Sequence, residues 1–324
     1  MIKVSVCITT YNVEKYIEQT LNSILSQKTS FKYEILIGDD CSTDNTRKIL
    51  LTYKAKFPQI ITLHFQEKNV GVNRNDYDLL YLAQGEYIAW CDGDDYWIDN
   101  YKLEKQVRFL ESNPQYSCVH TLWKNFYEKE NYFETINFEQ YDWEKTAKGK
   151  TYIERLLTKQ ESGCRFSSLL HPKNLVLKEL DKDSSILTKV DHLQNDFAIL
   201  CLLVDKGPTF LMKDVTVVYR NRPESLSITS SQYKRYIYDS KYLNLIIYLL
   251  KKYKFSSPII QKALHSITSF ILYCIYKNIG SRNDIKEIEK KLNEVHYNYS
   301  LGQKLILLSF KFNWMRVFLD KLIK

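Results

Sequence analysis

The first 95 residues alternate between segments that predict strands and segments that predict helices. The strand segments are rich in apolar and β-branched residues and lie at 3–9, 33–40, 60–66 and 86–91. The helical segments begin with capping residues or carry apolar residues at a helical period, and lie at 12–27, 42–57 and 76–85. This order predicts an α/β fold with an open, mostly parallel twisted sheet flanked by helices.

Polar residues follow three of these predicted strands. They lie at 9–12, 39–40 and 92–95. The carboxyl ends of parallel strands meet at one edge of a sheet, and ligands of open α/β sheets bind beyond that edge. We therefore expect these three polar segments to form one site.

The fourth strand is followed by three acids, Asp92, Asp94 and Asp95, in the sequence AWCDGDDYW. Two carboxylates about 4 Å apart repel by roughly 4 kcal/mol at an effective dielectric of 20. A capped turn is one explanation, because Asp-Gly favours turns and Asp caps helices. A divalent cation would neutralise all three charges, and Mg²⁺ or Mn²⁺ keeps positions open for phosphate oxygens. We predict a cation site, with the turn as the alternative.

Further polar residues at this edge allow two interpretations each. Asp39 and Asp40 either cap the next helix or accept hydrogen bonds from a nucleobase or ribose. Arg74, in NVGVNRN, is either a surface charge or a partner of phosphate or of an aspartate. Asp196, in QNDFAIL, is either an acid favoured by the helix macrodipole or a general base.

Six segments together resemble the family 2 inverting glycosyltransferases, which have the GT-A fold. They occur in the family's order and cover about residues 1–230. The segments are VSVCITTYN (4–12), EILIGDDCSTDNT (34–46), NVGVNRN (69–75), GEYIAWCDGDDYW (85–97), NDFAILCLLVDKG (195–207) and VYRNRPESLS (218–227).

The resemblance implies transfer of a sugar from a nucleotide-diphosphate donor, with UDP-sugars preferred. The acceptor would be a hydroxyl of a glycan or lipid-linked glycan, as in bacterial polysaccharide biosynthesis, and a hexosyl group would be transferred with inversion. Asp196 matches the general base, with Asp191 as the alternative. The family often has Glu where this chain has Asn195, so only one acid remains at that motif.

The resemblance also implies roles for the remaining site residues. Asp39 would contact uracil, with Asp40 supporting it, and Asp92 would contact ribose. The full implied nucleotide site comprises Thr9, Tyr11, Asp39, Asp40, Arg74 and Asp92. Asp94 matches the ligand of Mn²⁺ or Mg²⁺. The sugar and acceptor side would include Asp95 and Trp97, and a late loop near the diphosphate would include Arg220, Arg222 and Ser225.

The charge of the chain changes near residue 232. Residues 232–324 hold 17 Lys and Arg against 6 Asp and Glu, whereas the preceding residues hold 29 against 32. We therefore predict a catalytic domain at 1–231 and a basic, amphipathic helical region at 232–324. Residues 99–160 are expected to be mainly helical. The segment 303–324 carries aromatic residues among Lys and Arg, which fits either packing on the catalytic domain or a membrane surface.

The sequence also limits the class of protein. No run of about 18 apolar residues predicts a membrane-spanning helix, and the first residues lack the apolar core of a signal peptide. The seven scattered cysteines indicate reduced thiols. These observations favour a cytoplasmic protein, with possible peripheral contact at the inner face of the membrane, and no nucleic-acid motif is present. The alternatives are a non-catalytic sugar- or nucleotide-binding module and a sugar-nucleotide nucleotidyltransferase.

Overall fold

A computed structural model describes residues 1–134, 148–158, 164–223, 231–312, 315 and 319. The chain divides into two compact units. The first comprises Met1–Leu156, Gln160–Lys189 and Gln194–Arg222, and the second comprises Leu157–Lys159, Val190–Leu193 and Pro223–Lys324.

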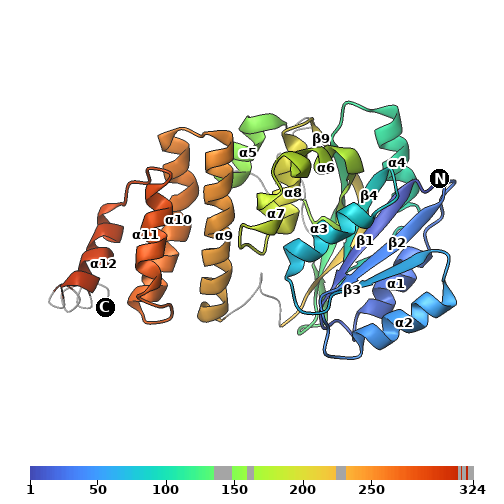
Figure 1. The fold of residues 1–324 in the computed structure, drawn as a ribbon, viewed down its shortest axis with the longest axis horizontal. Helices are drawn as coiled ribbons and strands as arrows, with labels where there is room; N and C mark the ends of the chain where they lie inside the picture. The colour runs from blue at the N-terminus through green and yellow to red at the C-terminus, as the bar shows by residue number, and fades with distance from the viewer. Residues whose placement is uncertain (135–147, 159–163, 224–230, 313–314, 316–318, 320–324) are drawn as a thin grey trace. The chain divides into compact units, whose positions relative to one another are not determined.

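The first unit is built on a mixed sheet whose opening half has the predicted topology. Its first four strands are β1 (Val4–Thr10), β2 (Tyr33–Asp39), β3 (Ile61–Phe65) and β4 (Tyr87–Asp92). They pair in parallel in the order β3-β2-β1-β4. The helices between them are α1 (Ile17–Leu25), α2 (Thr46–Lys56) and α3 (Val72–Leu82). Figure 1 shows α1 and α2 on one side of these strands and α3 on the other.

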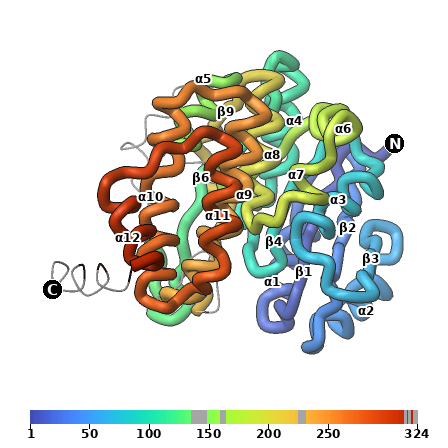
Figure 2. Tube along the Cα trace, turned by 60° about the vertical axis from the view of Figure 1, so that its left-hand side comes forward, coloured from blue at the N-terminus to red at the C-terminus, as the bar shows by residue number. Residues whose placement is uncertain are grey.

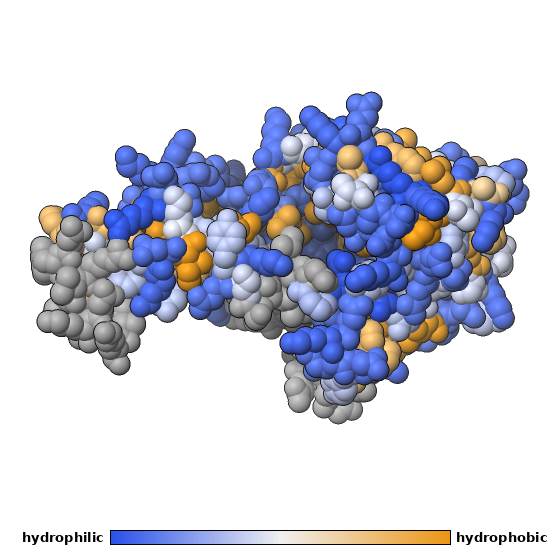
Figure 3. Space-filling model, turned by 90° about the horizontal axis from the view of Figure 1, so that it is seen from below, coloured by the Kyte–Doolittle hydropathy of each residue, from blue (hydrophilic) through white to orange (hydrophobic). Residues whose placement is uncertain are grey.

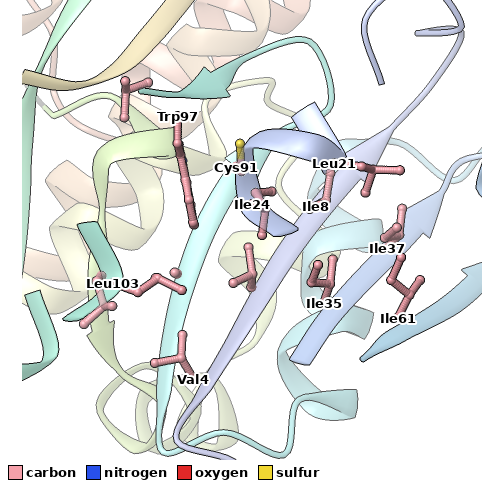
Figure 4. Packing of buried hydrophobic residues seen from close by; sticks show 14 of the residues in the cluster. Val4, Ile8, Leu21, Ile24, Ile35, Ile37, Ile61, Cys91, Trp97 and Leu103 are labelled. Atoms are coloured by element: carbon pink, nitrogen blue, oxygen red, sulfur yellow. The ribbon is translucent and has the colours of Figure 1, made fainter. Parts of the chain in front are cut away.

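Apolar burial explains why these segments form strands and helices. β1 is buried along almost its whole length, as expected for a strand covered on both faces. The buried residues of α1, Ile17, Thr20, Leu21 and Ile24, follow a helical period. Ile17, Leu21 and Ile24 pack in one core cluster with residues of β1, β2 and β4, part of which is drawn in Figure 4. The core thus fixes the direction in which the strand ends present their polar residues.

The second half of the sheet differs from the sequence prediction. Residues 118–127, expected to be helical, form the ten-residue strand β6 (Cys118–Tyr127). It pairs in parallel with β9 (Thr209–Asn221), and the sheet order continues β4-β8-β6-β9-β5. The short strands are β5 (Tyr96–Trp97), β7 (Tyr132–Glu134) and β8 (Leu170–Pro172). β8 pairs antiparallel with β4 and β6, and β5 pairs antiparallel with β9, so this half of the sheet is mixed.

Helices cover the rest of the first unit. They are α4 (Lys102–Ser112), α5 (Gly149–Leu157), the 3-10 turn η2 (Phe166–Ser168), α6 (Lys173–Lys182), α7 (Ser185–Thr188) and α8 (Asn195–Val204). α8 is almost completely buried after its first turn. All seven cysteines are free thiols, and only Cys41 is not buried.

The described part of the second unit contains four main helices, traced in Figure 2. They are α9 (Gln232–Tyr253), α10 (Ser257–Tyr276), α11 (Asp284–Asn293) and α12 (Leu301–Lys311). Most of the predicted amphipathic segment 303–324 beyond α12 lies outside the described residues. On the face shown in Figure 3, hydrophobic residues form scattered patches within a mainly hydrophilic surface.

Helix α10 is long and apolar enough to cross a membrane by length and composition alone. However, 56% of its apolar window is buried inside the structure. It packs against α9 and α12, and a core helix of a folded unit passes the same length and composition test. Within the described residues, α10 is the single helix of this kind, and it is weak evidence for a membrane span.

Candidate active site

Asp92 ends β4, and Asp94 and Asp95 follow it in a tight turn against the end of β1. The Asp95 N–H donates to the Asp92 carbonyl at 3.0 Å, and the Gly93 N–H donates to the Thr9 carbonyl at 3.1 Å. A Cβ atom on Gly93 would lie 2.9 Å from the Thr9 carbonyl oxygen. Glycine is therefore required by the close approach of the two backbones, and this approach places the acids beside β1.

Asp95 and Trp97 are buried, and their predicted place on the sugar and acceptor side stays a prediction. Asp95 is 1% exposed, and its oxygens accept from the Ser167 hydroxyl at 2.6 Å and the Arg220 N–H at 3.0 Å. Trp97 is 4% exposed and donates from Nε1 to the Ser167 carbonyl at 3.0 Å. Figure 4 shows Trp97 within the core cluster. These hydrogen bonds to Ser167 of η2 and Arg220 of β9 hold the turn against the rest of the first unit.

Asp94 is paired with a cation from the end of β9. The Arg222 Nε lies 2.7 Å from the Asp94 Oδ2, and the two side chains are 21% and 19% exposed. Burial raises the pKa of Asp94, and the Arg222 charge opposes this rise. Arg220 lies within β9 rather than in a loop. It is 8% exposed and donates to the Asp94 carbonyl at 2.9 Å, and its predicted role near the diphosphate stays a prediction.

Asp92 lies among other acids at this edge of the sheet. Burial raises its pKa well above the ordinary range, and the charges of Asp95, Asp94, Asp76 and Asp196 raise it further. Asp76 comes from α3 and Asp196 from α8, so acids from three elements converge here. These carboxyl groups can therefore ionise together only at a cost in free energy that a bound cation would offset.

The Asp39 side chain at the end of β2 is fully buried. It accepts hydrogen bonds from the Arg47 Nε, the Ser42 hydroxyl and the Thr10 hydroxyl, the last at 3.2 Å. Arg47, in α2, also lies with its guanidinium carbon 4.8 Å from the centre of the Phe65 ring. Sequence reasoning missed Arg47, and the predicted contact of Asp39 with uracil stays a prediction.

Asp40 holds the loop that leads into α3. Its oxygens accept from the Val70 N–H at 2.6 Å and the Gly71 N–H at 2.9 Å. Arg74 lies on α3 and pairs with Asp78 at 2.9 Å, with its side chain 53% exposed. The basic residue that contacts Asp39 is therefore Arg47, and the predicted phosphate role of Arg74 stays a prediction.

The two candidates for the base differ in their surroundings. Burial raises the pKa of Asp196, and the backbone N–H of Phe197 and the charge of Arg165 lower it. Asp191 belongs to the second unit, is 68% exposed and pairs with Lys241 at 2.9 Å. The geometry thus associates Asp196, through Asp92, with the acidic turn.

Two more predicted residues line this edge. Thr9 is partly buried, and Tyr11, directly after β1, is 48% exposed. Ser225 lies outside the described residues. Sequence reasoning missed Asp76, Arg165 and Ser167, since each reaches the site only through the packing of its element.

A cation fits the chemistry of the Asp94 side chain. Among the described residues, no three His, Cys, Asp or Glu side chains form a cluster that could hold a metal. The partly exposed Asp94 carboxylate nevertheless offers a hard oxygen ligand beside several other acids. The residues present therefore suit a divalent cation that takes its remaining ligands from a bound substrate and water.

Comparisons with known proteins agree on one family. A family model described as Glycosyl transferase family 2 matches residues 5–170. A putative teichuronic acid biosynthesis glycosyltransferase, TuaG of Bacillus subtilis, is 43% identical over 107 residues, which is 33% of this chain and 41% of that protein. The chain matches only about a third of the length of the first curated relatives.

Two solved structures resemble the whole chain. Staphylococcus aureus TarS 1-349 in complex with UDP-GlcNAc is 18% identical, with a TM-score of 0.55 over 96% of this chain and 92% of that one. The mannosyltransferase PcManGT of Pyrobaculum calidifontis, in complex with GDP-Man and Mn²⁺, is 16% identical, with a TM-score of 0.55 over 98% and 82%. At these identities the likeness concerns the fold, and it confirms the predicted GT-A fold.

Proposed function

Because this chain belongs to glycosyl transferase family 2, we propose that it transfers a hexosyl group from a nucleotide-diphosphate sugar to a hydroxyl of a glycan or lipid-linked glycan. One observation carries the proposal. The acidic turn and Asp196 come from distant parts of the chain, and the charge of Asp196 acts on Asp92. These observations support the proposal that a metal ligand and a general base act at one edge of the sheet.

The donor would lie across the ends of β1, β2 and β4. Tyr11 offers an exposed ring on which a base can stack, and Asp92 offers a carboxylate for ribose hydroxyls. The two similar structures contain UDP-GlcNAc and GDP-Man, both nucleotide-diphosphate sugars. We propose a UDP-sugar for this chain, since Asp39 matches the family position that contacts uracil.

Asp94 is the residue that would hold Mn²⁺ or Mg²⁺, and Arg222 is the cation already beside it. A divalent cation supplies positive charge that stabilises a departing diphosphate. Arg222 is placed to exchange its pairing with Asp94 for contact with phosphate oxygens, because both are anionic oxygen acceptors.

Asp196 would act as the general base. Its oxygen accepts the proton of the acceptor hydroxyl while that hydroxyl oxygen forms a bond to the anomeric carbon. The bond from this carbon to the phosphate oxygen breaks, and the nucleoside diphosphate leaves from the opposite face, which gives inversion. Burial raises the pKa of Asp196 and so strengthens it as a base.

The proposal is tested by nucleotide release and product formation from a panel of UDP- and GDP-sugars, with Mn²⁺ or with a chelator. Asp196→Asn should lower kcat by about 100-fold or more, whereas Asp191→Asn should leave it unchanged. Asp94→Ala should remove the dependence on the cation. The reverse pattern for Asp196 and Asp191 would overturn the base assignment. Binding of donors without any release of nucleotide would favour a non-catalytic module.

The basic second unit is proposed to contact an anionic membrane surface, where a lipid-linked acceptor would be found. Leu308 and Phe312 are exposed beside Lys304 and Lys311, a combination that favours acidic headgroups. Flotation of the full chain with phosphatidylglycerol vesicles, but not with phosphatidylcholine vesicles, is expected. Equal flotation or none would contradict it.

A further inference from the structure

Asp76 is a buried acid that the mechanism above does not use. It lies on α3 and is 0% exposed. Its Oδ2 accepts a hydrogen bond from the Asn195 side-chain amide, and the Thr9 side chain also bonds to it. Its Oδ1 has no hydrogen-bond partner among the described residues. An acid this deeply buried costs folding free energy unless its polar atoms are hydrogen-bonded or its charge is paired or neutralised.

The bond between Asp76 and Asn195 joins α3 to the first residue of α8. Asp196 is the next residue of α8, so the position of its backbone follows that of Asn195. Thr9 adds the end of β1 to the same connection. Asp76 therefore links α3 to α8 and to β1, and its partner in α8 directly precedes the candidate base.

We propose that Asp76 is a positioning residue, which through Asn195 fixes the first turn of α8 and thereby the direction of the Asp196 carboxylate. This inference rests on the proposed function, in which Asp196 is the base. It also gives Asn195 a role, because an amide can donate to the buried Asp76 carboxyl group, whereas a glutamate at this position would add a further acid.

The protonation of the two acids supports the assignment. Burial raises the pKa of Asp76 well above the ordinary range, and the charge of Asp196 raises it further. Burial raises the pKa of Asp196 as well, but the Phe197 N–H and the Arg165 charge oppose that rise, so the stronger tendency to stay protonated lies with Asp76. The ionisable groups that act on these acids are Asp92 of β4, Arg165 before η2, and Cys7, Cys164 and Cys201.

Steady-state kinetics of three variants test the inference. Asp76→Ala should lower kcat by about tenfold with the KM for the donor unchanged, because a displaced base is still present. Asp76→Asn preserves shape and neutrality and should stay within about threefold of the wild type. Asn195→Ala should match Asp76→Ala, and the double variant should lose no more than either single one.

The matched control is Glu34→Gln, which also removes a buried acid from the first unit. Glu34 lies in β2 and accepts from the Ser5 hydroxyl and the Gln84 N–H, so it belongs to the opposite end of the strands. Hydrogen exchange measured by mass spectrometry should show faster exchange at residues 195–199 in Asp76→Ala but not in Glu34→Gln.

The outcomes separate this inference from the proposed function. Unchanged kcat and unchanged exchange in Asp76→Ala, with loss of activity in Asp196→Asn, would overturn the inference alone. Loss of activity in Asp76→Asn equal to that in Asp196→Asn would also overturn it, since Asp76 would then act as a base. Full activity of Asp196→Asn would overturn the proposed base and with it the inference.

Discussion

Arg222 lies with its Nε 2.7 Å from the Asp94 Oδ2, and this ion pair joins the end of β9 to the acidic turn. The pair occupies the carboxylate that a cation would need. If Asp94 holds the cation, as we propose, Arg222 and the cation would compete for the same carboxylate in the protein without substrate.

Replacing Arg222 should strengthen cation binding. A partly exposed ion pair contributes about 0.2–1 kcal/mol, so Arg222→Gln should bind Mn²⁺ roughly 1.4- to fivefold more tightly in the absence of nucleotide. Titration followed by electron paramagnetic resonance measures this affinity. Arg108→Gln, which removes an arginine paired with Glu104 on the surface of α4, is the control. Equal Mn²⁺ affinity in Arg222→Gln and the wild type would show that the pair does not compete.

A side chain at position 93 should disrupt the turn. The added methyl group of Gly93→Ala would lie 2.9 Å from the Thr9 carbonyl oxygen and from the Thr10 Cγ2. We expect a loss of about 2 kcal/mol in the free energy of unfolding and a fall in activity, because Asp92 and Asp94 would shift. Urea unfolding provides the measurement. Gly302→Ala, with open space around it, should change stability by less than about 1 kcal/mol.

Tyr11 is expected to stack on the nucleobase. Loss of such stacking costs about 1–3 kcal/mol, so Tyr11→Ala should raise the Kd for UDP by roughly tenfold, whereas Tyr11→Phe should leave it unchanged. Isothermal titration calorimetry measures both. Tyr101→Ala, which removes a ring that is 50% exposed elsewhere in the unit, is the control. A Kd unaffected by Tyr11→Ala would remove Tyr11 from the nucleotide site.

Lys102 should make stability depend on pH. It is 0% exposed, its Nζ donates to the Gln106 Oε1 at 2.8 Å, and burial lowers its pKa to about 7. The pKa of Lys102 is lower in the folded protein than in the unfolded chain, where it is near 10.5. Above pH 10.5 the lysine is neutral in both states and does not reduce the free energy of unfolding. As the pH falls from 10.5 towards 7, the unfolded chain binds a proton that the folded protein does not, so the free energy of unfolding decreases. Lys102→Met should therefore raise the melting temperature by about 4 °C at pH 7 and by less at pH 10. A difference independent of pH would contradict this.

The sequence predicts the first half of the sheet well because its strands and helices are defined by local apolar patterns. β1 to β4 and α1 to α3 all appear where residue periodicity places them. β6 was not predicted, since a strand mixed with Tyr, Trp and His has no clear local pattern. Its structure depends on pairing with β9, about ninety residues later.

The candidate site shows the same division. The acidic turn and Asp196 were visible because carboxylates stand out at the ends of predicted elements. Asp76 was not, because the surrounding residues are polar and resemble the start of an exposed helix. The Arg47 contact with Asp39 depends on how α2 packs against β2, which residue spacing does not reveal.

The hydrogen bond from the Arg220 N–H to Asp95 joins residues 125 positions apart. During synthesis, the ribosome releases the DGDD turn long before β9 exists to hold it. A chain stopped before residue 220 would keep the contacts of this turn with Thr9 and Ser167 but would lack those with Arg220 and Arg222. We therefore expect the acidic turn to reach its final arrangement late in translation, after most of the first unit has had time to fold.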